Sequence, residues 1–478
     1  QKRRILLITT EIAPINPDTP LSEMSRHLPR IYRTQSHDIR VIIPKYNFIR
    51  DRKYNLREVI RLREIPVPLA GKLVWVAVKS GFIPDTRVQV YFLENEEYFN
   101  REGVLNDPST GEPYPDNDER FIVFCRAAVE MLRTLSWQPQ IVHCTDWTSG
   151  LVPYYIRKIY AENPFYQASK TILSLVNCDT PGTFPPEAVF KAGINPLEFK
   201  PGFDAELEGK LSFLKAGALY SDMIVTTGEI STNGFPEPEK SWLQGYLKEN
   251  PDKHSVQPLG IDHHIWNPDK DDKISTNFTH KELDGKLENR KVLLEKYKLK
   301  VEDGAPLVGC IWDGGNFEAL EATLEYLKSI GGAMVLSDKT AEEEPVARLA
   351  KEYTGNVGIV KLLTGLTIKQ IIAGTDMLVL HPTKNRDLLH LKSMKYGTIP
   401  IAPKDGYFGD DIVVDGDEMN GFLFNTADMA DNLLNTVKEA TDAFKDKKWN
   451  AMVKRVMKID NSWNKVARGY GEVYDTVD

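Results

Sequence analysis

The side chains that could bind a metal or act as nucleophiles are scattered along this sequence. His263 and His264 lie beside Asp262, and these residue types can bind zinc. Adjacent residues of an extended segment point in opposite directions, so the two imidazoles would not converge on one ion. The cysteines form no CxxC pair, and we expect buried free thiols in a reducing cytosol; they are Cys125, Cys144, Cys178 and Cys310. We therefore predict neither a metal site nor a bound cofactor.

Other well-known chemistries lack their motifs in this chain. The sequence contains no GxxxxGK[ST] phosphate loop, no HExxH and no GxSxG. The formal net charge is −8 and there is no long basic run, so nucleic-acid binding has little electrostatic support. No stretch approaches the roughly 20 apolar residues of a membrane span, and 4–10 is typical of a strand rather than a secretory signal. We expect a cytoplasmic protein without nucleic-acid or membrane partners.

The elements that would position a site alternate between strand and helix patterns. The chain has 478 residues, which favours two domains of roughly 200–250 residues each. Alternation of this kind predicts parallel sheets covered by helices, in an α/β, doubly wound architecture. In such domains ligands bind outside the carboxyl ends of the strands. The predicted strands include Ile5–Thr10, Ile39–Ile43, Ile141–Cys144, Lys170–Val176, Leu307–Trp312, Ala333–Leu336, Met377–His381 and Ile399–Ala402, and the predicted helices include Leu21–Arg33, Phe121–Leu135, Leu151–Tyr160, Leu283–Lys298 and Phe317–Ile330.

Several segments go beyond this general pattern, namely 10–14 (TEIAP), 99–103 (FNREG), 116–121 (DNDERF), 139–147 (PQIVHCTDW), 211–217 (LSFLKAG), 220–222 (YSD), 260–269 (GIDHHIWNPD), 394–398 (MKYGT) and 460–463 (DNSW). In order and spacing these segments resemble bacterial glycogen synthases and plant starch synthases. The first domain is the closer match, and it looks most like the divergent glycogen-synthase-like proteins of Bacteroidetes.

The resemblance implies a GT-B fold, in which two Rossmann-like domains face each other across a cleft. It also implies transfer of glucose from ADP-glucose to the non-reducing end of an α-1,4-glucan, with retention of the anomeric configuration. On this basis we expect a glucan-side domain at residues 1–260 and a nucleotide-sugar-side domain at 261–455. A C-terminal helix within 456–478 would return to the first domain.

The donor side of the expected site has lost its cations. Breaking a sugar–diphosphate bond builds negative charge on the leaving phosphate, which nearby cations must stabilise. The family supplies an Arg and a Lys, five residues apart, after the first strand of the second domain. Alignment with 306–312 places Asp313 and Glu318 at these positions. Two carboxylates would repel a diphosphate; freed from that demand, they could simply cap a helix and lie on a solvated face.

Four further family motifs are changed. The family's Thr-Gly-Gly turn aligns with 405–407, which keeps one glycine. The Lys-Thr-Gly-Gly-Leu loop aligns with 17–21, which begins at Pro17 and has lost its lysine and both glycines. The family's histidine that faces the glucose is Val176, which cannot donate a hydrogen bond. The loop that carries the family's sugar-binding Glu aligns with 382–389, where Asp387 is the one carboxylate that could substitute.

Part of the sugar side is kept. Asp146 and Trp147 match the family's Asp-Trp pair, and Glu11, Asn177 and Lys215 also match. Each has a structural alternative: Asp146 could equally cap the following helix, and Lys215 could be a solvated surface residue. His143, at a strand end, is interpreted as a packed core histidine rather than a catalytic one.

We therefore predict a glycogen/starch synthase homologue that is inactive or weak in glucosyl transfer and that binds an α-glucan or a protein partner, such as an active synthase. An active glycosyltransferase with an altered donor or acceptor is the alternative, with positive charge from Lys384, Arg386 and Lys404. A purely structural role in an assembly has no motif behind it. If a ligand binds, we expect a neutral sugar or glucan before a nucleotide diphosphate.

Overall fold

The computed structural model describes residues 2–16, 19–177, 180, 182–228, 232, 234–312, 314–338, 344–381, 388–405 and 407–478. The chain forms two compact units, one of Gln1–Leu259 with Trp463–Asp478 and one of Gly260–Ser462. Several residues singled out in the sequence lie outside the described residues, namely Pro17, Cys178, Asp313, Lys384, Arg386 and Asp387.

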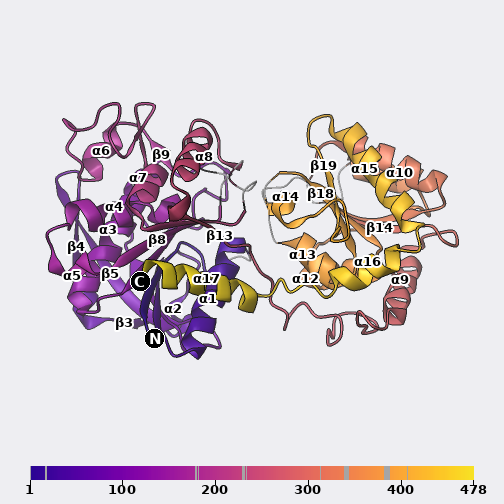
Figure 1. Ribbon diagram of the computed structural model, residues 1–478, viewed down its shortest axis with the longest axis horizontal. Helices are drawn as coiled ribbons and strands as arrows, with labels where there is room; N and C mark the ends of the chain where they lie inside the picture. The colour runs from indigo at the N-terminus through magenta and orange to yellow at the C-terminus, as the bar shows by residue number, and fades with distance from the viewer. Residues whose placement is uncertain are drawn as a thin grey trace. The chain divides into compact units, whose positions relative to one another are not determined.

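The first unit is built on a parallel sheet with strand order β6-β2-β1-β7-β8-β12-β13. Figure 1 labels two of these strands, β8 and β13. Strands with consecutive labels do not always neighbour each other: β2 and β6 lie on one side of β1, and β7, β8, β12 and β13 on the other. β7 is buried along its whole length, as expected of a parallel strand covered on both faces. The strands are β1 (Arg4–Ile8), β2 (Asp38–Pro44), β6 (Gln89–Glu94), β7 (Ile141–Thr145), β8 (Lys170–Leu175), β12 (Met223–Thr226) and β13 (His254–Val256).

An antiparallel extension continues this sheet beyond β6. β5 (Lys72–Phe82) pairs with β6, and β3 (Arg57–Glu58) and β4 (Ile65–Leu69) each pair with β5. Pro66 and Pro68 alternate along β4 with buried apolar residues and lie exposed, a position that suits proline because an edge strand tolerates the missing amide donors. A separate small antiparallel sheet joins β9 (Thr183–Phe184), β10 (Glu206–Leu207) and β11 (Lys210–Ser212).

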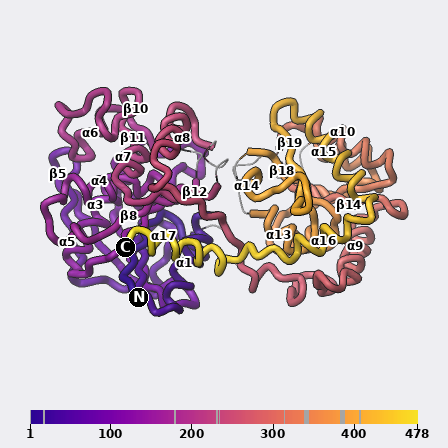
Figure 2. Tube along the Cα trace, viewed as in Figure 1, coloured from indigo at the N-terminus to yellow at the C-terminus, as the bar shows by residue number. Residues whose placement is uncertain are grey.

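The C-terminal helix α17 (Trp463–Val477) packs against α1 (Pro20–Thr34) in the first unit. Figure 2 shows this last segment, in yellow, running beside α1. The Trp463 indole stacks on the His27 ring at 5.5 Å, and the Tyr32 hydroxyl donates to the Ala467 carbonyl at 2.6 Å. The other helices of this unit are α2 (Asp51–Tyr54), α3 (Asn117–Leu135), α4 (Leu151–Tyr154), α5 (Pro164–Gln167), α6 (Glu187–Lys191), α7 (Phe213–Tyr220) and α8 (Glu239–Glu249).

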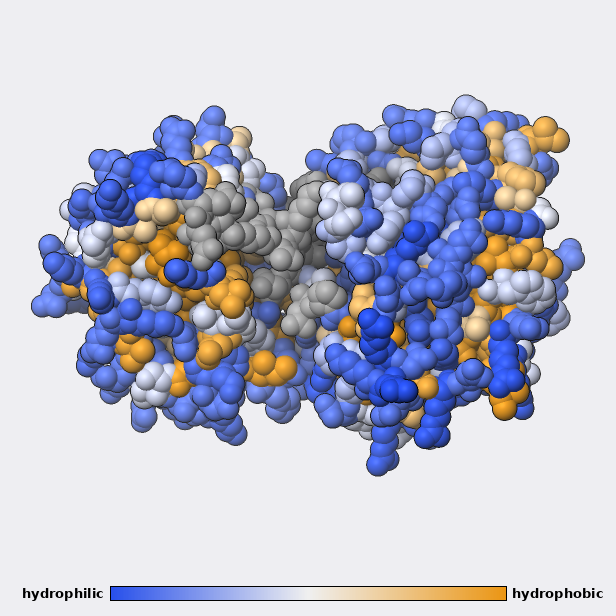
Figure 3. All heavy atoms as spheres, turned by 180° about the vertical axis from the view of Figure 1, so that it is seen from behind, coloured by the Kyte–Doolittle hydropathy of each residue, from blue (hydrophilic) through white to orange (hydrophobic). Residues whose placement is uncertain are grey.

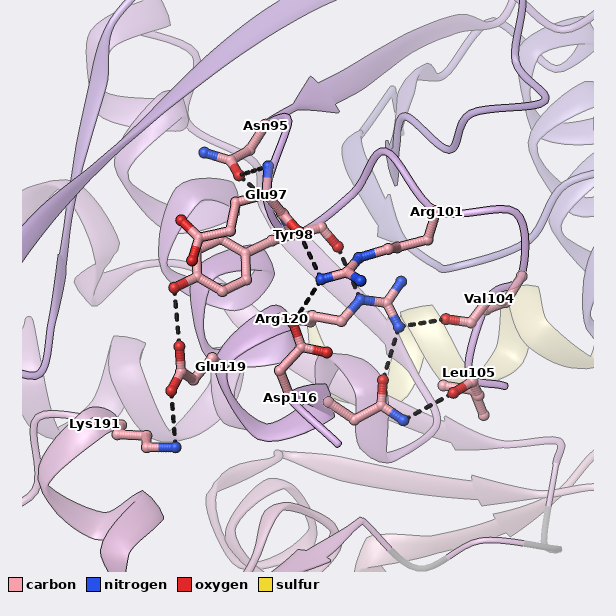
Figure 4. A network of polar contacts seen from close by, with 11 residues as sticks. Asn95, Glu97, Tyr98, Arg101, Val104, Leu105, Asp116, Glu119, Arg120 and Lys191 are labelled. Carbon is pink, nitrogen blue, oxygen red and sulfur yellow. Dashed lines mark hydrogen bonds and ion pairs between the residues drawn. The ribbon is translucent and has the colours of Figure 1, made fainter. Parts of the chain in front are cut away.

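A network of hydrogen bonds and ion pairs stabilises the loop between β6 and α3 (Figure 4). Arg101 donates to the Glu97 carbonyl and to Asp116, both at 2.8 Å. Arg120 is buried and donates to the Tyr98 and Val104 carbonyls, each at 2.8 Å. Two of the sequence segments that carry the family resemblance, 99–103 and 116–121, therefore hold this loop through their arginines.

The second unit has an all-parallel sheet with strand order β16-β15-β14-β17-β18-β19. The order runs one way from β14 to β16 and the other way from β17 to β19, as in a doubly wound sheet. The prediction of two Rossmann-like units is confirmed. The strands are β14 (Leu307–Trp312), β15 (Ala333–Asp338), β16 (Val357–Val360), β17 (Met377–Leu380), β18 (Ile399–Pro403) and β19 (Phe422–Phe424), and the helices are α9 (Asp284–Tyr297), α10 (Phe317–Ser329), α11 (Glu344–Glu352), α12 (Gly365–Gly374), α13 (Leu389–Lys395), α14 (Tyr407–Asp411), α15 (Met429–Phe444) and α16 (Trp449–Val456).

A buried lysine joins three helices of the second unit. Lys286, on α9, donates from Nζ to the Ile372 and Ala373 carbonyls in the last turn of α12. It also donates to the carbonyl of Tyr396, the residue that ends α13, and to the Thr398 hydroxyl. The last carbonyls of a helix have no partner within it and carry partial negative charge, so one ammonium satisfies two helix ends here.

Figure 3 shows that hydrophilic residues cover most of one face of the molecule, with smaller apolar areas among them. Scattered apolar side chains of this kind are ordinary on protein surfaces. Within the described part of the chain, no helix combines the length and the apolar character that a membrane span requires.

Candidate functional site

The residues that sequence analysis assigned to the sugar side gather at one edge of the first unit. Glu11 follows β1, Asp146 follows β7, and Val176 and Asn177 follow β8. These three strands are neighbours in the parallel sheet. Because their carboxyl ends meet at the same edge, the side chains come together where doubly wound sheets bind ligands.

Asp146 is the most constrained of these residues. Its φ of 55° lies in the left-handed region, which costs free energy for a residue with a Cβ atom. Oδ1 accepts the backbone N–H of Val176 at 2.6 Å and of Asn177 at 3.0 Å. The side chain makes no capping bond to the short helical turn Trp147–Ser149 that follows, so its hydrogen bonds serve the end of β8 instead.

The second carboxylate oxygen of Asp146 has no such partner. The residue is 3% exposed, and within the described residues nothing donates a hydrogen bond to the buried Oδ2. Burial raises the pKa of Asp146 to about 7, against the two backbone amides and the Asn177 side chain that lower it, and the charge of Glu11 raises it further. A carboxyl group in this state titrates near neutral pH and keeps one oxygen available for a donor.

Glu11 forms the other half of a pair of carboxyl groups. Burial raises its pKa, which the hydrogen bond from the Thr19 hydroxyl partly offsets. Two nearby carboxyl groups oppose each other's ionisation, so their titrations are coupled. The site therefore favours neutral hydrogen-bonding groups over further negative charge.

Sequence analysis missed Tyr46, which lies two residues after the end of β2. Its ring is fully buried and stacks on Phe48 at 5.3 Å. Within the described residues its buried hydroxyl has no hydrogen-bond partner. Burial raises the pKa of Tyr46, and the charges of Arg120 and Glu11 also act on it, which places the ring near this edge of the sheet. The available signal was a polar aromatic residue just after a buried strand.

Trp147 and Lys215 are held by other contacts. The Trp147 indole is 4% exposed and packs among Phe121, Phe184 and Phe213. Lys215 donates from Nζ to the Glu206 carbonyl at 2.6 Å and lies over the Trp242 ring at 5.6 Å. These contacts anchor both side chains in the body of the unit, whereas Glu11 and Asp146 interact with each other.

His143 is a packed core residue, as expected. Its Nδ1 shares a hydrogen bond of 2.8 Å with the Tyr474 hydroxyl of α17, and its Nε2 shares one of 2.7 Å with the Ser174 hydroxyl. Burial lowers the pKa of His143 to about 3, so the ring is neutral at physiological pH. The histidine therefore joins α17 to the strands that carry the Asp146 edge.

The corresponding edge of the second unit carries Glu318 at the start of α10. Glu318 is exposed and lies in the first turn of this helix, which has no side-chain cap at Asn316. The positive end of a helix dipole is a natural anion site. The Glu318 carboxylate therefore lies at the place where an anionic ligand would bind. His263, also on this unit, shares a hydrogen bond of 2.7 Å with Asn461.

Comparisons with known proteins agree with this architecture. A family model described as starch synthase catalytic domain matches residues 4–239. The glycogen synthase of Chlorobaculum parvum is 32% identical over 483 residues and that of Chlorobaculum tepidum is 30% identical over 481, covering 98% of each chain in both cases. The catalytic domain of starch synthase IV from Arabidopsis thaliana, solved with ADP and acarbose bound, superposes with a TM-score of 0.80 at 24% identity and covers 100% of both chains. A sucrose-phosphate synthase from Thermosynechococcus elongatus gives a TM-score of 0.54 at 14% identity, with 99% of this chain and 98% of that chain covered.

Proposed function

The chain belongs to the glycogen and starch synthase family of glycosyltransferases and has its GT-B fold, and from this premise we propose that it binds α-glucan through its first unit and transfers glucose from ADP-glucose weakly or not at all. The observation that carries the proposal is the state of Asp146, a buried carboxyl group with one oxygen fixed by two backbone amides and the other without a partner.

A sugar hydroxyl is the group that would best complete this arrangement. An unsatisfied buried oxygen costs about 1–3 kcal/mol, and a hydroxyl donor would recover that free energy. The neighbouring Glu11 carboxyl group, with its raised pKa, suits the same kind of ligand. A diphosphate would meet two acids here, whereas a glucan brings many neutral hydroxyl donors and no charge.

The donor side supports the loss of transfer. In the aligned family the positions of Asp313 and Glu318 supply cations to the leaving diphosphate. Losing one charge-assisted hydrogen bond costs about 1.5–3 kcal/mol, and reversing the charge adds repulsion. Glu318 also takes the favourable position at the start of α10, where a ligand phosphate would otherwise profit from the helix dipole.

Glycogen co-sedimentation tests the binding half of this proposal. We expect the purified chain to pellet with glycogen and Asp146→Ala to lose most of that retention while keeping its circular dichroism spectrum. Glu249→Gln, an exposed residue of α8, is the matched control and should pellet like the wild type. Equal retention of the Asp146 variant would show that the glucan does not bind at this site.

An active transferase with a different donor is the second candidate. The strained backbone at Asp146 favours it, because conformations of this cost persist mainly where a function needs them. Lys404, exposed just after β18, is a described cation that could meet another donor. Thermal-shift measurements with ADP-glucose, UDP-glucose and GDP-mannose discriminate: a rise with one of them supports this candidate. A protein partner such as an active synthase, and a cytoplasmic location, stay predictions.

A further inference from the structure

Two rings face each other at the carboxyl edge of the second unit's sheet. Trp312 is the last residue of β14, and His381 directly follows β17. Their ring centroids are 4.3 Å apart and their planes meet at 63°. The His381 amide donates to the Ile311 carbonyl at 3.0 Å, which continues the parallel register that pairs Ile311 with Leu380. Side chains at paired positions of parallel strands lie on the same face, so the contact follows from the register.

These strands are the two between which the strand order reverses. β14 leads through its helix toward β15 and β16, whereas β17 leads toward β18 and β19. At such a point the connections leave toward opposite faces of the sheet and open a crevice, which is where open α/β sheets bind their ligands. The Trp312–His381 pair lies at the carboxyl ends of these two strands, where such a crevice would open.

The indole is fixed in this position by the loop that leads to α10. Trp312 is 2% exposed, and its Nε1–H donates to the Gly315 carbonyl at 2.8 Å. Gly314, Gly315 and Asn316 all have positive φ, at 83°, 68° and 44°. A phosphate at this place would need close approach to backbone amides at the start of the helix. The loop instead turns the Gly315 carbonyl toward the indole N–H of Trp312.

We propose that Trp312 and His381 plug the ligand crevice of the second unit and exclude nucleoside diphosphates sterically, in addition to the repulsion from Glu318. The inference rests on the proposed function and deepens it, because it names nucleoside diphosphates as the ligands that the second unit excludes. Two separable causes would then prevent nucleotide binding: the rings of Trp312 and His381 fill the space, and Glu318 adds negative charge.

A two-by-two set of variants separates shape from charge. Isothermal titration with ADP is measured on the wild type, Trp312→Ser, Glu318→Lys and the double variant, all as full chains. We expect no ADP binding by the wild type or by Glu318→Lys, and at least tenfold tighter binding by the double variant than by either single one. Trp75→Ser, at an exposed tryptophan of β5, combined with Glu318→Lys is the control and should gain nothing.

Three outcomes overturn the proposal. The first is a folded double variant that binds ADP no more tightly than Glu318→Lys does. The second is a wild type that binds ADP without any change in the emission of Trp312, which is measured as the difference between the wild type and Trp312→Phe. If Trp312→Ser does not fold, His381→Ala with Glu318→Lys serves in its place, and no gain there is the third. Failure of the proposed function has a different signature: the Asp146→Ala variant would keep its wild-type glycogen retention, whereas the ADP titrations would be unaffected.

Discussion

Oδ1 of Asp146 accepts the backbone N–H of Val176 at 2.6 Å. The family resemblance implies a histidine at the Val176 position, but this hydrogen bond uses only the backbone amide. The contact therefore depends on the backbone just after β8 and not on the side chain at this position. It would hold the Asp146 carboxyl group in the same orientation with either residue.

The pH dependence of stability follows from the raised pKa of Asp146. The folded chain holds a proton on this group up to about pH 7, whereas the unfolded chain releases it near the ordinary aspartate pKa of 3.8. Between these values the folded state binds more protons, so the free energy of unfolding falls as pH rises. We expect urea unfolding from pH 4 to 8 to show this loss in the wild type.

Asp146→Asn should flatten that pH profile, because its amide cannot titrate. The wild-type slope approaches roughly 1.4 kcal/mol per pH unit where only this group titrates. Glu249→Gln, at an exposed position, should keep the wild-type profile. An Asn variant with an unchanged slope would mean that another group is responsible.

Tyr46→Phe removes a buried hydroxyl that has no partner among the described residues. Since an unsatisfied polar group is destabilising, we expect the free energy of unfolding to stay the same or to rise by about 1 kcal/mol. Tyr32→Phe, which loses a hydrogen bond of 2.6 Å to Ala467, should instead lower it by about 1 kcal/mol. Denaturant melts of both variants check the difference, and equal losses would refute it.

Lys286→Met should lower the free energy of unfolding by about 1–3 kcal/mol. The substitution leaves the carbonyls of Ala373 and Tyr396 without this donor, while the Ile372 carbonyl keeps the Thr398 hydroxyl. Lys291→Met, on the exposed side of the same helix, removes only a surface pair with Glu288 and should leave the free energy of unfolding close to the wild-type value. A similar loss of unfolding free energy in both variants would show that the hydrogen bonds from Lys286 to the ends of α12 and α13 contribute little to stability.

Gly182→Ala should destabilise the first unit and disturb Trp147. Gly182 has a φ of 66°, and an added Cβ would lie 2.4 Å from the Trp147 ring. Gly209→Ala is the matched control, with a φ of 78° and nothing within 4 Å of its Cβ. The control measures the backbone cost alone, about 1 kcal/mol. We expect Gly182→Ala to exceed it by at least about 1 kcal/mol and to change the near-UV circular dichroism, which Gly209→Ala leaves intact.

Much of the fold follows from local pattern, and the failures have physical causes. Helix α3 begins at Asn117, before the predicted Phe121, because its first turn is polar and bonds the loop before it. The predicted helix Leu151–Tyr160 is α-helical only to Tyr154 and continues as a π-helical turn. The pair β4 and β5 was not predicted, since Pro66 and Pro68 argue against a strand until the edge position is known.

The candidate site, like the fold, could be predicted only in part from the sequence. The family resemblance led to Asp146, Glu11 and Asn177 because their strands and motifs are contiguous in sequence. No local pattern could show that an oxygen of Asp146 would lack a partner, or that Tyr46 would lie near the charge of Glu11. Nor could it show Trp312 against His381, a contact between strands that are far apart in sequence. Such contacts depend on how distant strands are ordered in the sheet.

The loss of glucosyl transfer is measured by the incorporation of radiolabelled glucose from ADP-glucose into glycogen. We expect incorporation by the wild type no greater than by Asp146→Ala, with both at the level of a protein-free blank or barely above it. Robust incorporation by the wild type that Asp146→Ala abolishes would instead show that this chain is an active synthase.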